Sequence, residues 1–204
     1  MIRISRAIEN DRPGTDSERE IYRQYNYSNT IARNDVELEK AEKLFDAVDL
    51  HSGIDSTLLI LQHRLSATEN SPEIRAIREY GNLPLITCYP SQLNQVFLNI
   101  INNAIDAIRH NPECSQEPEI RICTEACDRE RIRIAIANTD STILPRIQSR
   151  IFEPFFTTKS VGRGTGLGLF VSYSIVQKHG GILKVRSHPK AGTEFEIILP
   201  HECA

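Results

Sequence analysis

The sequence predicts an α/β fold, of the α+β kind, in which amphipathic helices pack against antiparallel hairpins. One long segment, 93–108, carries apolar residues at helical spacing and predicts an amphipathic helix. Isoleucines alternate with polar residues on both sides of a turn at 128–130, which predicts a hairpin that buries one face. A second hairpin pattern, over 182–199, closes the domain.

Length and composition describe a globular protein with one domain and an appendage. The chain has 204 residues, of which 40% are hydrophobic and 25% charged. A net charge of −3 gives no bulk electrostatic attraction to nucleic acid or to an anionic membrane. No apolar run approaches the roughly 18 residues of a membrane span, and the first residues lack an apolar signal core, so we expect a cytoplasmic location.

The cysteines predict structural thiols and no metal site. The chain has five cysteines and no CxxC pair. Cys123 and Cys127 are four residues apart in an expected strand, so they should face the same side of it.

The first part of the chain, 1–44, differs in composition from the rest. It is rich in charged residues and poor in large apolar ones, with helices expected over 16–33 and 36–45. Such a segment cannot bury much core by itself, which leaves a mobile or a partner-docking segment as the two interpretations. We place the start of the globular domain, 45–204, near Phe45.

The other elements follow from local patterns. Apolar spacing predicts a helix over 52–65, and Ser91 is the expected N-cap of the long helix. A further helix follows the glycines with Leu167, Phe170, Val171, Ser174 and Ile175 at helical spacing, and it ends at His179-Gly180-Gly181, where a C-cap is expected. The remaining strands are expected at 46–50, 73–80 and 85–89, the last two on either side of the turn Gly81-Asn82, and at 182–187 and 194–199.

The long helix carries asparagines inside its apolar face. Asn is a poor residue in the middle of a helix because its amide competes for backbone hydrogen bonds. Asn99 and Asn103 are four residues apart and share a face, with Asn102 beside them. They are either buried amides satisfied by neighbouring backbone or a polar strip that lines a pocket.

Four glycines stand at every second position after an aromatic segment, in IFEPFFTTKSVGRGTGLGLFV. Glycine permits close backbone approach and positive φ, and a loop that enters a helix N-terminus presents free N–H groups that suit phosphate. A plain linker is the other interpretation, but FEPFFTTK is neither polar nor of low complexity. The glycines are Gly162, Gly164, Gly166 and Gly168.

These motifs resemble those of one family. GRGTGLGL resembles the second glycine box of sensor histidine kinase ATPase domains of the GHKL superfamily, and FEPFF resembles their F box. NIINNAIDA is similar to the N box, and GTEFEIILP to the closing box. The resemblance covers about Phe45 to Pro200 and implies a two-layer sandwich, with a mixed, mostly antiparallel sheet and helices on one face.

The resemblance also implies an ATP and Mg²⁺ site. Asn103 would coordinate the Mg²⁺ bound to ATP, and Asn99 would lie beside the phosphates. Lys159 is a candidate phosphate contact, with a solvated lysine as the equal alternative. Asn138 and Thr193 would contact adenine. The phosphates would lie against the glycine loop, at Gly162, Gly164, Thr165, Gly166, Leu167, Gly168 and Leu169.

The sequence departs from the family pattern at the first glycine box, which usually reads DxGxG. Here Asn138 stands at the Asp position, and Asp140 and Thr142 stand at the two glycines. Asn138 can still accept a hydrogen bond from adenine, but without charge assistance. The departures therefore fall on the adenine half of the site, whereas the motifs of the phosphate half are intact.

No histidine of this chain fits the family's phosphoacceptor, which an acidic residue follows on a dimerisation helix. Only His201 precedes a Glu, and three residues follow it. We therefore expect an ATP-dependent protein histidine kinase domain that phosphorylates a His on a partner chain, with a downstream response regulator. The alternatives are a non-catalytic nucleotide-binding remnant and a serine kinase of the anti-sigma-factor type.

Overall fold

The computed structural model describes residues 45–69, 71–111, 117–128, 130–139, 142–159, 164–189 and 191–202. The chain divides into Met1–Lys43 and Leu44–Ala204, and all the described residues belong to the second unit. The helices expected over 16–33 and 36–45 therefore fall almost wholly outside the described residues. Within the described ranges, no helix combines the length and the apolar character that crossing a membrane requires.

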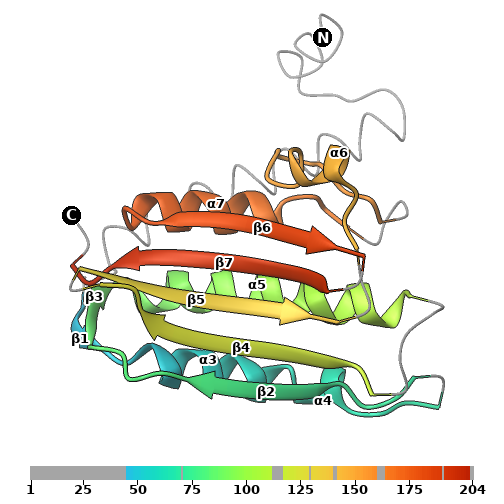
Figure 1. The fold of residues 1–204 in the computed structure, drawn as a ribbon, viewed down its shortest axis with the longest axis horizontal. Coiled ribbons are helices and arrows are strands. Elements are labelled where there is room, and N and C mark those ends of the chain that lie inside the picture. The colour runs from blue at the N-terminus through green and yellow to red at the C-terminus, as the bar shows by residue number, and fades with distance from the viewer. Residues whose placement is uncertain are drawn as a thin grey trace, which may run out of the picture. The chain divides into compact units, whose positions relative to one another are not determined.

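A five-stranded sheet forms one layer, in the order β2-β4-β5-β7-β6 (Figure 1). β2 pairs with β4 in parallel, and the other three pairings are antiparallel. The sheet is therefore mixed and mostly antiparallel, as predicted. Its strands are β2 Arg75–Tyr80, β4 Glu119–Ala126, β5 Arg131–Asn138, β6 Ile182–His188 and β7 Gly192–Pro200.

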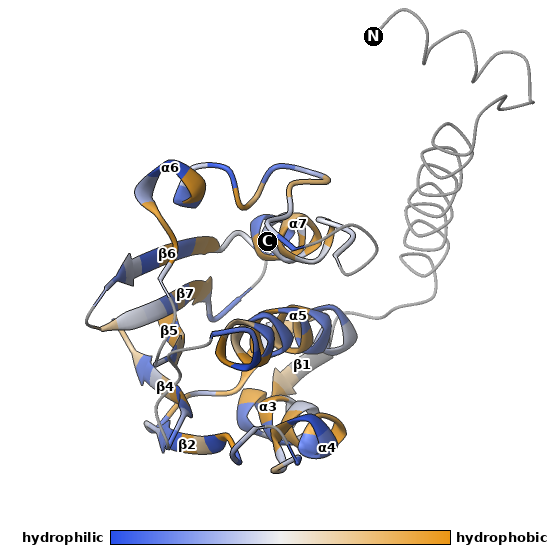
Figure 2. Ribbon diagram, turned by 90° about the vertical axis from the view of Figure 1, so that its right-hand side faces the viewer, coloured by the Kyte–Doolittle hydropathy of each residue, from blue (hydrophilic) through white to orange (hydrophobic). Residues whose placement is uncertain are grey.

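Three helices form the second layer and lie on one side of the sheet (Figure 2). They are α3 Leu50–Ile60, α5 Pro90–Arg109 and α7 Gly168–Lys178. Two short helices, α4 Gln62–Leu65 and α6 Pro145–Gln148, lie in the connections. A separate two-stranded sheet pairs β1 Phe45–Val48 with β3 Ile86–Cys88.

The core lies between α5 and the sheet. The predicted apolar stripe of α5 is buried throughout, and so are the alternating isoleucines of β4 and β5. Burying an Ile side chain contributes about 1.5–3 kcal/mol, so these two patterns together fix the layers. The buried strand isoleucines are Ile120, Ile122, Ile132, Ile134 and Ile136.

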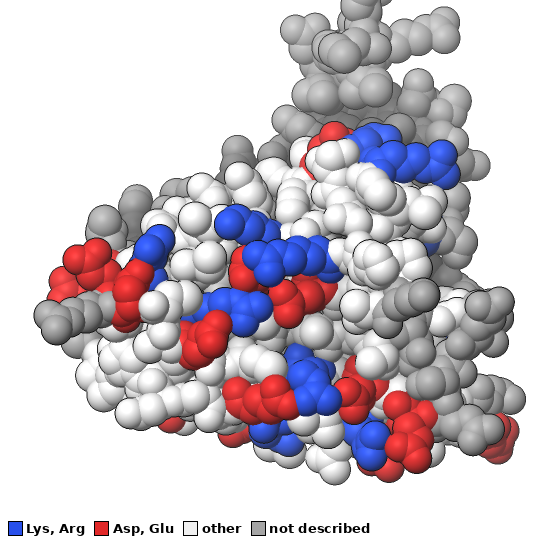
Figure 3. Space-filling model, viewed as in Figure 1, with Lys and Arg blue, Asp and Glu red and all other residues white. Residues whose placement is uncertain are grey.

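The other face of the sheet carries charged side chains of both signs, which Figure 3 shows side by side across the strands. Arg133 on β5 lies at the centre of one group and pairs with Glu125, Glu194 and Glu196. Arg186 on β6 pairs with the same two glutamates of β7. Opposite charges alternate across neighbouring strands, so the pairs are satisfied within the sheet.

The predicted helix over 52–65 is wrong in its limits. It begins at Leu50, and the carboxylate of Asp49 caps it by accepting from the His51 backbone N–H (2.9 Å). Leu61 has φ −87° and ψ 1° and separates α3 from α4. The expected strand over 46–50 accordingly ends at Val48.

The expected N-cap at Ser91 is also wrong. α5 begins at Pro90, and Tyr89 occupies the N-cap without a side-chain bond. Proline at the first helical position is already set at a helical φ, and it lacks the N–H that would otherwise be unsatisfied there.

The strands expected around Gly81-Asn82 exist but do not pair with each other. β2 pairs with β4, and β3 pairs with β1, so the turn joins two different sheets. β4 ends at Ala126, so Cys127 follows the strand and does not share a strand face with Cys123.

Candidate functional site

The long helix α5 is the platform of the site. Asn99 and Asn103 lie one turn apart on one face and are half-buried, whereas their apolar neighbours Ile100 and Ala104 are buried in the core. Packing of the apolar stripe stabilises the helix, and this offsets the poor helix propensity of the asparagines.

Asn99 joins α5 to the start of α7. Its Nδ2 donates to the Gly168 carbonyl oxygen (3.1 Å) and to Ser172 Oγ (3.2 Å). Ser172 Oγ in turn donates to the Gly168 carbonyl oxygen (2.8 Å). The amide of Asn99 therefore fixes the first turn of α7 against α5.

The buried face of α7 differs from the predicted stripe. Ser172 and Val176 are fully buried, whereas Ser174 is exposed and Phe170, Val171 and Ile175 are only partly buried. Ser172 can be buried because it hydrogen bonds with Asn99 and with the Gly168 carbonyl oxygen. The spacing of apolar residues does not indicate such a buried polar contact.

The N-terminus of α7 follows the glycine loop directly, as predicted. Leu167 is the N-cap and makes no side-chain cap bond, so the first turn keeps backbone N–H groups that no capping side chain occupies. Thr165 Oγ1 accepts from the Leu167 N–H (3.3 Å), and Leu169 packs against the core. Such an N-terminus suits a phosphate group.

The glycines let this loop pack against the F box segment. Gly166 has φ +65°, and a β-carbon there would lie 2.4 Å from the Phe155 carbonyl carbon. A β-carbon on Gly164 would lie 2.6 Å from Thr157 Oγ1, whereas one on Gly168 would make ordinary contacts. Gly162 lies outside the described residues. Gly166 is thus required by the fold itself: its positive φ agrees with the sequence, whereas its contact with the F box segment had no signal there.

Asn103 contacts the predicted lysine. Lys159 Nζ donates to Asn103 Oδ1 (3.2 Å) and to Asp106 Oδ2 (2.5 Å). Arg64, on α4, donates from Nη2 to Asp106 Oδ1 (2.5 Å) and from Nη1 to Asn102 Oδ1. The Asp106 carboxylate therefore bridges two cations, Lys159 and Arg64, beside the asparagines of α5.

Burial and charge act in opposite directions on Asp106. Partial burial raises the pKa of its carboxyl group, but the hydrogen bonds from Lys159 and Arg64 outweigh burial and hold the pKa below its ordinary value. Asp106 is therefore ionised at neutral pH, and the cluster carries one net positive charge.

The two predicted adenine contacts come together at the end of the sheet. Asn138 and Thr193 are partners in the β5–β7 register, and both are buried. Asn138 Nδ2 donates to the Thr139 carbonyl oxygen (3.0 Å), and the hydroxyls of Thr193 and Ser187 are 2.8 Å apart. Thr142 is exposed, and Asp140 lies outside the described residues.

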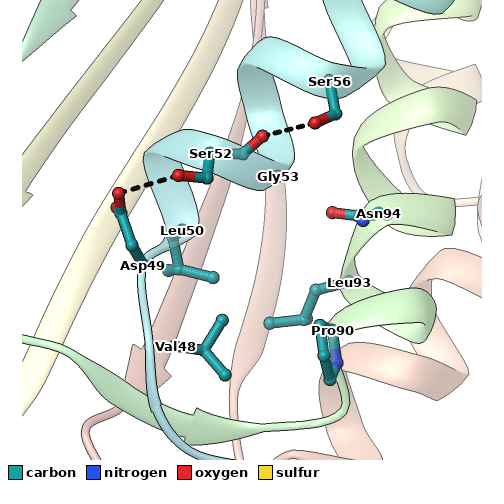
Figure 4. A pocket seen from close by; sticks show the side chains of 9 residues that line it. All are labelled: Val48, Asp49, Leu50, Ser52, Gly53, Ser56, Pro90, Leu93 and Asn94. Carbon is teal, nitrogen blue, oxygen red and sulfur yellow. Dashed lines mark hydrogen bonds between the residues drawn. The ribbon is translucent and has the colours of Figure 1, made fainter.

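A cavity of about 370 Å³ lies elsewhere, beside the start of α5 (Figure 4). Asn94, which lines this cavity, precedes Asn99 by five residues, so the cavity is displaced from Asn99 by about 7.5 Å along the axis of α5. Among the described residues, none of the predicted site residues lines this cavity. The lining residues are Val48, Asp49, Leu50, Ser52, Gly53, Ser56, Pro90, Leu93 and Asn94.

Three polar residues beside the asparagines of α5 were not predicted from the sequence: Asp106, Ser172 and Arg64. Asp106 follows Asn103 by three residues, so its position on the same helix face could have indicated it. Ser172 and Arg64 gave no such signal, because Arg64 lies far from its partners in the chain and Ser172 interrupts an apolar pattern.

Known proteins are similar to this chain in sequence and in fold. Residues 88–202 match the family described as histidine kinase-, DNA gyrase B-, and HSP90-like ATPase. Sporulation kinase E of Bacillus subtilis (strain 168) is 40% identical over 58% of this chain and 15% of the kinase. Sensor histidine kinase ZraS of Escherichia coli (strain K12) is 35% identical over 84% of this chain and 35% of ZraS.

A solved structure gives the same result. The crystal structure of full-length ShkA in complex with AMPPNP is 25% identical, with a TM-score of 0.65 over 79% of this chain and 32% of ShkA. The chain thus spans about 15% to 35% of the length of these two curated kinases. With more than half of its residues matched by the family model, the chain belongs to the histidine kinase-, DNA gyrase B- and HSP90-like ATPase family.

Proposed function

We propose that this chain is the ATP-binding catalytic domain of a two-component sensor histidine kinase. It binds Mg²⁺·ATP along the face of α5 that carries Asn99 and Asn103, and it supports transfer of the γ-phosphoryl group to a His on a partner chain. The phosphoryl group then passes to a response regulator. The relatives named sporulation kinase E and ZraS support the class of function.

One observation carries the proposal: Asn99 and Asn103 connect two groups suited to phosphate. Asn99 holds the N-terminus of α7, where backbone N–H groups favour an anion. Asn103 Oδ1 accepts one hydrogen bond from the Lys159 ammonium group, and an amide oxygen has two acceptor sites, so it can also bind a second partner. An amide oxygen of this kind suits Mg²⁺, which prefers oxygen ligands and retains water.

Each part of the site has a separate task. Mg²⁺, when bound, would neutralise charge on the phosphates. The first turn of α7 and Lys159 would bind and orient the phosphate chain, and most of the catalysis would come from this positioning. Asn138 and Thr193 would bind adenine at the end of the sheet, and ShkA, which was crystallised with AMPPNP, supports a nucleotide of this kind.

Calorimetry with purified protein tests the proposal. Wild type should bind ATP in Mg²⁺ and bind it much more weakly in EDTA, because Mg²⁺ links the phosphates to Asn103. Asn103→Ala should lose most of this Mg²⁺ dependence. Its affinity for ATP in Mg²⁺ should fall by up to about tenfold, as expected when a hydrogen bond or ligand to a charged group is removed.

Asn111→Ala is the matched control, since Asn111 follows α5 and lies two turns beyond Asn103. It should bind like wild type. Equal and Mg²⁺-insensitive binding by wild type and Asn103→Ala would refute the assignment of Asn103.

With γ-labelled ATP, the chain alone should acquire no acid-labile label, because none of its histidines fits the phosphoacceptor pattern.

A further inference from the structure

Lys159 is held by two acceptors that lie on the same helix. Its Nζ contacts Asn103 Oδ1 (3.2 Å) and Asp106 Oδ2 (2.5 Å), and its side chain is 33% exposed. An ammonium group has three N–H donors, so a third hydrogen remains beyond these acceptors among the described residues. A half-buried lysine in this geometry can keep Asp106 and still donate to an anion.

Asp106 is itself held in place from the other side. Arg64 Nη2 donates to its second oxygen (2.5 Å), and the guanidinium also reaches Asn102. Arg109 fixes the segment that carries Arg64, because its Nη2 donates to the carbonyl oxygens of Arg64 (3.0 Å) and Ser66 (2.7 Å). The carboxylate is thus fixed by contacts that join α5 to α4 and the residues just after it.

The charges in this cluster leave an excess that suits phosphate. Two cations, Arg64 and Lys159, share the single carboxylate of Asp106. Arg64 therefore neutralises Asp106, and the charge of Lys159 remains available to an anion beside Asn103.

We propose that Asp106, fixed by Arg64, is a positioning residue that holds the Lys159 ammonium group beside Asn103, oriented for the terminal phosphate of ATP. This inference rests on the proposed function. Lysine loses much rotamer freedom when it is ordered, so holding it in place before the nucleotide arrives raises affinity for ATP. ADP lacks the terminal phosphate and gains less.

A purely electrostatic role for Asp106 predicts the opposite sign. A carboxylate beside the phosphates repels them, so its removal would strengthen the binding of ATP and of ADP equally, whether or not Lys159 is present. The positioning role predicts that removal of Asp106 weakens the binding of ATP more than that of ADP, and that it does so only while Lys159 is present. A double-mutant cycle separates the two roles.

The cycle compares wild type, Asp106→Asn, Lys159→Met and the double variant by calorimetry with ATP and with ADP in Mg²⁺. We expect each single change to lower the preference for ATP over ADP about fivefold to tenfold, the size of a lost charge-assisted hydrogen bond. The double variant should resemble Lys159→Met alone. Arg64→Met should lower the preference in the same direction but less. Asp55→Asn, which removes a carboxylate that pairs with Arg78 on β2, is the control and should bind like wild type.

A second measurement needs no nucleotide. The chain has only six lysines, so the Nζ signal of Lys159 can be assigned in ¹⁵N-lysine NMR spectra by its loss in Lys159→Met. Asp106→Asn should shift this signal and speed its hydrogen exchange, and Asp55→Asn should do neither.

The outcomes separate the two proposals. If wild type binds neither nucleotide, the proposed function fails and the positioning role fails with it. Two results would overturn only the positioning role, provided that wild type binds ATP. One is that Asp106→Asn keeps the preference for ATP over ADP. The other is that Asp106→Asn binds both nucleotides more tightly, both with Lys159 and with Lys159→Met. An unchanged Lys159 signal in Asp106→Asn also overturns it.

Discussion

Asn138 lies at the end of β5, almost fully buried and in register with Thr193. Its amide nitrogen donates to the Thr139 carbonyl oxygen (3.0 Å), which directs its side-chain oxygen elsewhere. A β-carbon on Gly192 would lie 2.0 Å from the Asn138 carbonyl oxygen, so Gly192 packs directly against the backbone of Asn138.

Asn138→Asp should bind ATP several-fold more tightly. A carboxylate accepts a charge-assisted hydrogen bond from the adenine amino group, which adds about 1 kcal/mol over a neutral acceptor. The same change removes the bond to Thr139 and buries a charge, so the free protein should be less stable by about 1–3 kcal/mol. Calorimetry measures the affinity, and thermal melts with and without ATP measure the stability.

GTP is the control for this prediction, because its purine presents a carbonyl oxygen where adenine has an amino group. Its affinity should not rise in Asn138→Asp. If ATP affinity also stays the same, both in the single variant and after Asp140 and Thr142 are changed to glycine, Asn138 is not the adenine contact.

At the scale of elements, the two ends of α7 are fixed in different ways. Its N-terminus is held by Asn99, and its C-terminus ends in a Schellman motif: Gly180 has φ +68°, Gly181 N donates to the Val176 carbonyl oxygen (2.9 Å), and Gly180 N to that of Gln177 (2.9 Å). This confirms the C-cap that the sequence predicted at His179-Gly180-Gly181.

His179 then joins α7 to α5. The ring is buried, with Nδ1 2.8 Å from the Ile175 carbonyl oxygen, and Nε2 accepts from the Tyr89 backbone N–H (3.1 Å) at the start of α5. These two bonds require the neutral tautomer with its hydrogen on Nδ1. His179 therefore has a structural role at the end of α7.

His179→Ala should lower the free energy of unfolding by about 2–3 kcal/mol, because it leaves the Tyr89 N–H without its acceptor and opens a small cavity. For a domain of this size, that corresponds to a fall of roughly 4–12 °C in Tm. His188→Ala, at an exposed position on β6, is the control and should change Tm little. Equal melting of the two variants would show that His179 does not join the helices.

The elements that the sequence predicted well are those with local signals. The stripe of α5, the β4–β5 hairpin and the glycine stop of α7 each depend on residues close in the chain. The parallel pairing of β2 with β4 and the contact of Arg64 with Asp106 join residues more than 40 positions apart. Such contacts depend on the packing of whole layers, so no pattern in the sequence indicates them.

For the same reason, the site was predicted unevenly. Asn99 and Asn103 share a helix face, and their spacing alone places them together. Asn138 and Thr193 meet only because β5 and β7 pair in that register, and the sequence linked them through the family resemblance. The break of the first helix at Leu61 had no glycine or proline to indicate it.

At the scale of the whole molecule, one face of the sheet is covered by helices (Figure 2) and packs on the apolar core, and the other carries charged side chains (Figure 3). On the charged face, Glu196 is the least exposed glutamate, with 7% of its side chain accessible. It accepts from Arg133 Nε (2.7 Å) and Arg186 Nη2 (3.3 Å). Glu125 pairs with the same Arg133 (3.2 Å) but is 60% exposed.

These two glutamates allow a matched test of how burial strengthens an ion pair. The hydrogen bond from Arg133 lowers the pKa of Glu196, and partial burial opposes it without cancelling it. Because the pKa in the folded protein is below the ordinary value of 4.5, the ionised group contributes stability above that pH. The contribution decreases as the pH falls through the folded pKa, where both states become protonated.

Glu196→Gln should therefore lower the free energy of unfolding by about 1–3 kcal/mol at pH 7, because Gln accepts from Arg133 without charge assistance. The difference from wild type should shrink as the pH falls below about 4.5 and disappear in stronger acid. Glu125→Gln should cost roughly 0–1 kcal/mol at pH 7, since an exposed pair is screened by solvent. Urea titrations of the three proteins between pH 7 and pH 3 measure these differences. If the loss in free energy of unfolding for Glu196→Gln stays constant across this range, lost packing and not lost charge is responsible. If the two variants lose the same free energy of unfolding, the burial of Glu196 adds nothing to its pair with Arg133.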